Sequence, residues 1–182
     1  DHLAGRIAAA HALNDRPVPG IGPSGEPLWP EDVSGSITHS GTQAMAVVVR
    51  DRQALIGIDC EAILPEYEAR EIKDGIVDAQ EERVLTRTEY PFALALTLAF
   101  SAKESLFKAL FPRVKSYMGF DCARVTMLDD STLTLALTRP LADYTEGATF
   151  TLHWQLHGEQ AITLLSHAPA DVPSRWSPQT SR

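Results

Sequence analysis

A single long helical segment, followed by short strands, does most to limit the folds that this chain can adopt. The segment begins at Pro91, a residue suited to a first helical turn, runs to about Leu110 and is expected to stop at Pro112. After it, leucines alternate with threonine or alanine over residues 132–137, which is the period of a half-buried strand. Further strands are predicted over residues 122–128, 150–156 and 161–166.

The first part of the chain also begins with a helix and continues with strands. Apolar residues at helical spacing predict a helix over residues 3–13, and residues 17–30, rich in proline and glycine, are expected to form an ordered loop or hinge. Another helix is expected to start at Asp78, because Glu81 three residues later has the position of a capping-box partner. Strands are predicted over residues 35–39, 45–49 and 55–61. This order of elements predicts an α+β protein made of two similar-sized halves.

Composition and charge exclude several classes of protein. The chain has 182 residues with 16 basic and 24 acidic side chains, and its net charge of −8 makes it a poor binder of nucleic acids or anionic membranes. Cys60 and Cys122 are its only cysteines, which excludes a disulfide scaffold and a four-cysteine zinc site, and we expect both to be reduced in the cytoplasm. No apolar run is long enough to span a membrane, and the first residues do not form a signal peptide. They resemble the middle of a helix, so we expect residues upstream to be missing.

Two carboxylates are predicted to lie side by side on one strand. Residues two apart on a strand point to the same face, so Asp59 and Glu61 share one face while Ile58 and Cys60 share the other. Adjacent carboxylates repel each other and favour a cation, and oxygen ligands select a hard ion such as Mg²⁺. The same pattern also fits a solvated strand edge followed by an acidic surface.

The long helix carries a second group of charged residues. Ser101, Glu104 and Lys108 are spaced so that they share one helical face, and Glu104 would supply a third carboxylate beside the strand pair. Lys103 and Lys108 would then supply positive charge for a phosphate. An ordinary surface ion pair between Glu104 and Lys108 is the alternative.

His39 and Arg6 are two further candidates. His39 lies at the end of a predicted strand among small hydroxyl residues, where it can donate a hydrogen bond to a phosphate, but a lone histidine can also be purely structural. Arg6 lies on the first predicted helix and by itself suggests only a surface arginine.

Two motifs in order carry a resemblance to a known family. Gly57-Ile58-Asp59-x-Glu61, followed by Phe100-Ser101-x-Lys103-Glu104-Ser105-x-x-Lys108, resembles the two-part signature of the 4′-phosphopantetheinyl transferases. The resemblance covers residues 3 to about 166 and is strongest to the Sfp-type class, in the branch of enterobactin synthase component D. Four further segments carry it: residues 3–6, 27–30, 35–40 and 96–103.

The resemblance implies both an activity and a fold. Such enzymes move the 4′-phosphopantetheine arm of coenzyme A to a serine of an acyl, peptidyl or aryl carrier protein and release adenosine 3′,5′-bisphosphate. Their fold is a pseudo-twofold pair of similar α/β subdomains with the active site in the cleft between them, and they are monomeric. We expect subdomains over residues 1–54 and 55–168, and a disordered tail over residues 169–182. A Mg²⁺-dependent nucleotide pyrophosphatase and a non-catalytic module that binds coenzyme A or a carrier are the alternatives.

The resemblance also implies roles for individual residues. Asp59, Glu61 and Glu104 would hold Mg²⁺, or Mn²⁺, across the coenzyme A pyrophosphate. Glu104 would act as the base, directly or through a metal-bound water, and Lys108 would donate to the pyrophosphate or help to position the base.

Coenzyme A and the carrier protein would meet other residues. Lys103, Arg6 and His39 would bind coenzyme A phosphates, with His39 at the 3′-phosphate. A patch after the main helix is a candidate for carrier docking, although an ordinary exposed loop explains it equally well. That patch consists of Arg113, Val114, Lys115, Tyr117 and Met118.

Overall fold

The computed structural model describes most of the chain. The described residues are 5, 6, 8, 9, 12, 20–24, 26–41 and 43–168. Of the helix predicted over residues 3–13, the five described positions are helical. The expectation of a disordered tail over residues 169–182 lies outside the described residues.

Two antiparallel hairpins make up the N-terminal part. The short strands β1 (Gly20–Ile21) and β2 (Pro27–Leu28) pair within the segment expected to be an ordered loop. They are followed by β3 (Ser34–Ser40) and β4 (Gln43–Val49), which confirm two predicted strands. The turn between β3 and β4 contains Gly41 at a φ of 60°, a conformation that glycine adopts without strain.

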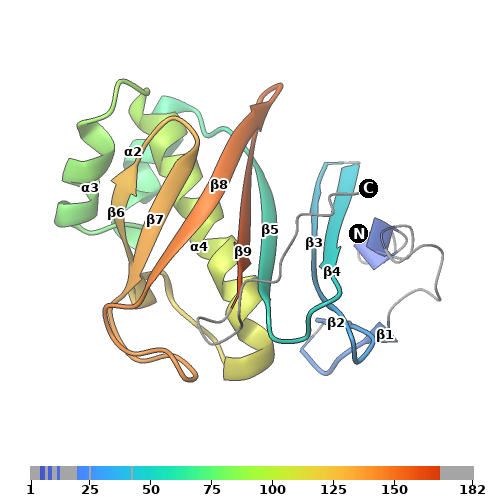
Figure 1. Ribbon diagram of the computed structural model, residues 1–182. Helices are drawn as coiled ribbons and strands as arrows, with labels where there is room; N and C mark the ends of the chain where they lie inside the picture. The colour runs from blue at the N-terminus through green and yellow to red at the C-terminus, as the bar shows by residue number, and fades with distance from the viewer. Residues whose placement is uncertain are drawn as a thin grey trace.

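A five-stranded antiparallel sheet forms the larger part of the molecule (Figure 1). Its strand order is β5-β9-β8-β7-β6. All five strands match predicted ones to within one residue at each end. They are β5 (Leu55–Ala62), β6 (Ala123–Leu128), β7 (Thr132–Leu137), β8 (Thr149–His157) and β9 (Gln160–His167).

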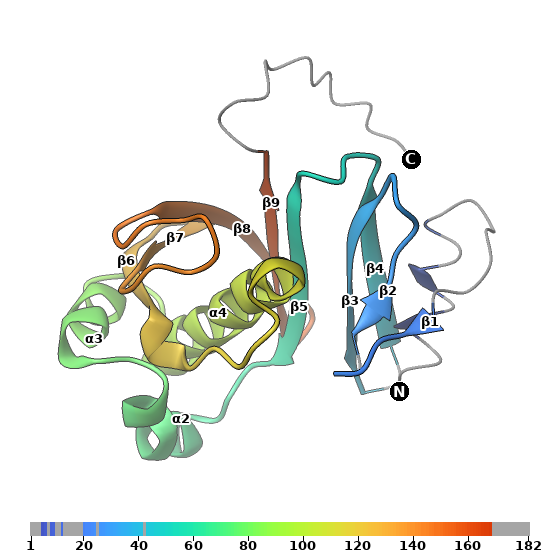
Figure 2. The same ribbon diagram turned by 90° about the horizontal axis from the view of Figure 1, so that it is seen from below.

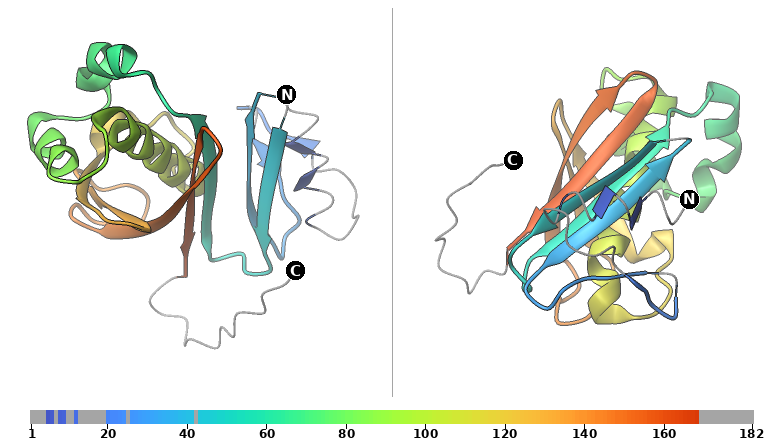
Figure 3. Two further views of the ribbon diagram at one scale, coloured as in Figure 1. Left: turned by 90° about the horizontal axis from the view of Figure 1, so that it is seen from above. Right: turned by 90° about the vertical axis from the view of Figure 1, so that its right-hand side faces the viewer.

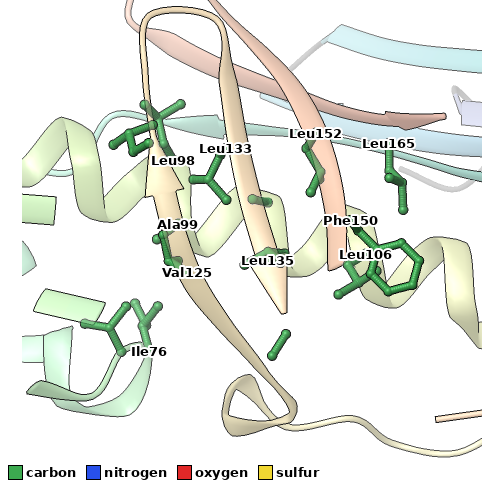
Figure 4. Close-up of a cluster of buried hydrophobic side chains, with 14 of the residues drawn as sticks. Ile76, Leu98, Ala99, Leu106, Val125, Leu133, Leu135, Phe150, Leu152 and Leu165 are labelled. Carbon is green, nitrogen blue, oxygen red and sulfur yellow. The ribbon is translucent and has the colours of Figure 1, made fainter. Parts of the chain in front are cut away.

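Helices cover one side of this sheet. The long helix α4 (Phe92–Val114) packs across it, as Figure 2 shows end-on. The apolar core lies between α4 and the sheet, where leucines from both elements interdigitate with Phe150 (Figure 4). The α+β fold class is therefore confirmed, and no helix in the described part of the chain is long and apolar enough to cross a membrane.

The helices before α4 were only partly predicted. Asp78 caps α3 (Ala79–Thr86) with the expected capping box, in which its carboxylate accepts a hydrogen bond from the Glu81 amide at 2.8 Å. The helix α2 (Glu66–Ile72), read from the sequence only as an acidic surface, was missed. Short 3₁₀ turns follow at Lys73–Gly75 and Phe120–Cys122.

Pro112 does not stop α4, which corrects the predicted end of that helix. Pro112 lies in the last turn, where it removes a single helical hydrogen bond. The helix continues to Val114 and ends where Lys115 adopts a left-handed conformation with φ 53° and donates to the Phe111 carbonyl at 2.8 Å.

The two parts of the molecule meet along two strands. In the views of Figures 1 and 3, β3 lies beside β5, the edge strand of the five-stranded sheet. The division into subdomains at residues 54 and 55 stays a prediction, as does their pseudo-twofold relation.

Candidate active site

A cleft of about 890 Å³ lies between the N-terminal hairpins and α4. One wall consists of residues 26–30 and 33–39, and the other consists of one face of α4 together with residues 115–118. Asp59, Glu104 and Lys108 line it. The strand β5 and the helix α4, which carry the two predicted motifs, therefore bring these three charged residues into one cavity, whereas Glu61 and Lys103 are not among the residues that line it.

The three predicted carboxylates influence one another. Burial and the neighbouring carboxylates of Asp59 and Glu104 raise the pKa of Glu61 to about 8. Burial and the charge of Asp59 also raise the pKa of Glu104 above its usual value. Asp59 therefore lies close enough to both Glu61 and Glu104 to disfavour their ionised forms, while the shared metal site expected from the three residues stays a prediction.

One oxygen of this cluster lacks a hydrogen-bond partner. Asp59 is only 3% exposed, and its Oδ2 accepts no hydrogen bond from the residues that the structure describes. A buried carboxylate oxygen without a donor is costly, so the site favours a cation. Carboxylate oxygens alone suit a hard ion such as Mg²⁺. In the described residues, however, no three His, Cys, Asp or Glu side chains are grouped closely enough to hold a metal as they stand.

Lys108 links the two sides of the cleft. Its ammonium donates to the Ile37 carbonyl at 3.2 Å, to the Ile58 carbonyl at 2.9 Å and to Asp59 Oδ1 at 3.2 Å. These contacts use all three of its N–H donors, so Lys108 holds Asp59 and joins β3 to β5.

Lys103 lies elsewhere, which corrects the prediction that it binds a phosphate of coenzyme A. Its side chain is fully buried and pairs with Glu81 Oε2 at 2.8 Å. It also donates to the carbonyls of Ile76 and Phe120 at 2.7 and 2.8 Å. Burial lowers the pKa of the Lys103 amine, an effect that the Glu81 carboxylate opposes. Lys103 therefore anchors α4 to its neighbours and does not face the cleft.

His39 and Arg6 are brought together at the cleft. Both line it, and Gly5, which precedes Arg6, lies against Ile37 and His39. The contact of these two residues with phosphates stays a prediction.

The predicted docking patch is only partly available. Arg113 donates to the Gln53 carbonyl at 2.7 Å and to the Tyr144 hydroxyl at 3.2 Å, so its guanidinium binds the protein itself. Met118 is buried, whereas Lys115 and Tyr117 are exposed at the cleft rim, Tyr117 by 90%.

Gly57 has a positioning role that the sequence reading missed. A Cβ at this position would clash with the Ser105 carbonyl oxygen and lie 3.3 Å from the Ala109 methyl carbon. Only glycine lets β5 approach α4 this closely, and a glycine inside a strand was the available signal.

Comparison with known proteins agrees with this geometry. The family model described as the 4′-phosphopantetheinyl transferase superfamily matches residues 55–165, and the 4′-phosphopantetheinyl transferase N-terminal domain matches residues 1–49. Enterobactin synthase component D of Salmonella typhi is 44% identical over 91% of this chain and 70% of its own length. The Escherichia coli K12 protein of the same name is 41% identical over 92% of this chain and 76% of its own length.

A solved structure is a weaker match. The holo-[acyl-carrier-protein] synthase (AcpS) of Thermotoga maritima covers 62% of each chain with a TM-score of 0.44 and 19% identity. The two family models and the relatives, which span most of the sequence, establish the relationship without it. The chain belongs to the 4′-phosphopantetheinyl transferase superfamily.

Proposed function

We propose that this chain carries out the transfer typical of its superfamily with the residues that line the cleft. The 4′-phosphopantetheine arm of coenzyme A moves to a serine hydroxyl of an acyl, peptidyl or aryl carrier protein, and adenosine 3′,5′-bisphosphate leaves. The observation that supports this most directly is the pair of carboxylates, Asp59 with its unpartnered buried oxygen and Glu104, that line a cleft formed by both parts of the molecule.

Asp59, Glu61 and Glu104 are the residues that would hold Mg²⁺ or Mn²⁺. When bound, the ion neutralises charge on the pyrophosphate and stabilises the leaving phosphate. Lys108 keeps Asp59 in place through its 3.2 Å contact with Oδ1. Glu104 lines the cleft one helical turn before Lys108 and accepts the proton that the attacking serine loses.

Arg6 and His39 bind the phosphates of coenzyme A in this proposal. Both line the cleft on the side opposite α4, so the nucleotide lies across it with the 3′-phosphate at His39. Binding that is equal in the ground state and the transition state lowers KM without changing kcat. These two residues therefore hold the nucleotide and leave the chemistry to the carboxylates.

Lys115 and Tyr117 at the cleft rim would meet the carrier protein. Lys115 offers positive charge on an otherwise acidic chain, and Tyr117 offers exposed aromatic surface. The relatives are named for enterobactin synthase, so a siderophore carrier is the first partner to test. We further propose that the enzyme is a monomer and acts in the cytoplasm.

Mass spectrometry tests the function directly. An apo carrier protein, incubated with the enzyme, coenzyme A and Mg²⁺, is expected to gain the mass of one phosphopantetheine group. Release of bisphosphate without any carrier would instead show a pyrophosphatase, and binding of coenzyme A without a reaction would show a binding module. Repeating the assay with a panel of carriers identifies the preferred one.

A further inference from the structure

Two hydroxyl side chains of β3 bind the backbone of β5 on either side of Asp59. The Ile58 amide donates to Ser36 Oγ at 3.0 Å, and the Cys60 amide donates to Thr38 Oγ1 at 3.1 Å. Ser36 and Thr38 are only 4% and 3% exposed. The two hydroxyls and the two amides follow the same two-residue period, so they form a regular clasp along both strands.

This hydroxyl clasp, formed by Ser36 and Thr38, takes the place of a backbone ladder. In the described part of the chain β5 pairs with β9 and β3 pairs with β4, yet β3 and β5 lie side by side (Figure 1). The side-chain oxygens of Ser36 and Thr38 accept hydrogen bonds from the edge amides of β5. In a continuous sheet, carbonyls of the neighbouring strand would accept these hydrogen bonds. The Lys108 ammonium adds one more link, because it reaches carbonyls of both strands.

The clasp joins the strands that carry two different parts of the proposed site. His39 follows Thr38 on β3, and Asp59 lies between the two clasped amides on β5. Side chains alternate along β3, and those of Ser36 and Thr38 point toward β5 and bind it. The side chain of His39, the next residue, therefore points to the other face of β3. A shift of β3 along β5 would change the separation between His39 and Asp59 directly.

We infer that Ser36 and Thr38 are positioning residues that set the distance between the phosphate-binding His39 and the carboxylate cluster. This rests on the proposed function. A ligand held at two ends gains affinity only when the spacing of the two contacts matches its own length. The clasp therefore allows His39 to bind the 3′-phosphate of coenzyme A while the pyrophosphate lies at the carboxylates, so that both contacts contribute to the affinity for coenzyme A.

The test compares Thr38→Val with Thr38→Ser. Valine keeps the shape of threonine but removes the acceptor and leaves the buried Cys60 amide unpaired, whereas serine keeps the oxygen. The measured quantities are Kd and kcat/KM for coenzyme A and for 3′-dephospho-coenzyme A. We expect Thr38→Val to reduce the preference for coenzyme A by about tenfold and Thr38→Ser to restore most of it.

Thr97→Val is the matched control. Thr97 is 1% exposed, and its hydroxyl also accepts a backbone amide, that of Leu64 at 3.0 Å, but it lies outside the cleft. Its loss should lower stability without changing the ratio between the two nucleotides. Ser36→Ala, which removes the other acceptor of the clasp, provides the same comparison if Thr38→Val does not fold.

Each outcome decides the inference. A Thr38→Val protein that is less stable but keeps the wild-type preference would show that the clasp only stabilises the fold, and a wild-type protein that binds both nucleotides equally would also overturn the inference. Failure of the wild type to modify any carrier would overturn the proposed function instead, while the two Kd values would still test the clasp.

Discussion

Replacing Gly57 by alanine should damage both the fold and the active site. The added Cβ would lie 2.7 Å from the Ser105 carbonyl carbon and closer still to its oxygen, whereas ordinary contact begins at 3.4 Å. The carbon alone requires β5 and α4 to separate by about 0.7 Å, and the oxygen requires more.

The surroundings of Ser105 make this separation costly. The obstacle is helix backbone, which cannot rotate aside as a side chain could. The Ser105 hydroxyl also bonds the carbonyl and hydroxyl oxygens of Thr163 on β9 at 3.1 and 2.7 Å. We expect the free energy of unfolding to fall by about 3 kcal/mol, the upper part of the usual range for overpacked cores.

The same movement separates the catalytic groups. Asp59 lies on β5, and Glu104 and Lys108 lie on α4, so their distances change together. Misplacement of reacting groups by about 1 Å can cost roughly 10²-fold in rate, and we expect a loss of that order in kcat for carrier modification.

Urea unfolding and transfer kinetics measure the two effects. Gly75→Ala is the control, because a Cβ there meets nothing within 4 Å and Gly75 does not have a positive φ. A Gly57→Ala protein that unfolds like the wild type and transfers within twofold of its rate would refute the close-packing argument.

Four other substitutions test three separate features. Asp59→Asn and Glu104→Gln should each remove most transfer in a folded protein, with exposed Glu89→Gln as the control; near wild-type rates at saturating Mg²⁺ would contradict the metal assignment. Lys103→Met leaves a buried acid without its partner and should destabilise the protein by about 3–5 kcal/mol in chemical unfolding, whereas an unchanged stability would refute the buried ion pair. Burial lowers the pKa of His167 below 6.5, so its protonation favours the unfolded chain. That contribution is complete above pH 6.5 and is lost as the pH falls through the folded-state pKa; His167→Gln should flatten this part of the stability profile, and an unchanged profile would contradict the assignment.

The sequence predicted correctly that Asp59 and Glu104 meet at one site, but it did not predict the surroundings of the two lysines. Asp59 and Glu104 belong to motifs whose local periodicity shows which way each side chain points. Lys103 and Lys108 are five residues apart, so an α-helix places them about 140° apart around its axis, and this separation explains why the two predicted phosphate contacts do not face one site. What no spacing could show is the partner of Lys103, because Glu81 lies on another helix.

Other differences have local causes. The helix Glu66–Ile72 is short and mostly polar, so it is stabilised by its tertiary contacts and has no clear apolar periodicity by which the sequence could predict it. Pro112 lies close enough to the end of its helix that the chain tolerates the lost hydrogen bond. The clasp of Ser36 and Thr38 depends on β3 lying beside β5 in the fold, which a single sequence does not reveal.

The buried Glu81 carboxylate couples parts of the molecule that would otherwise open independently. It accepts the Asp78 amide at 3.0 Å, the Val125 amide at 2.9 Å and the Lys103 ammonium at 2.8 Å, and so ties the start of α3 to β6 and α4. No one of these elements can detach without leaving a charge or an amide unpaired. In hydrogen–deuterium exchange the Asp78 and Val125 amides should consequently exchange in one cooperative opening event, at a rate that reports the stability of this whole unit.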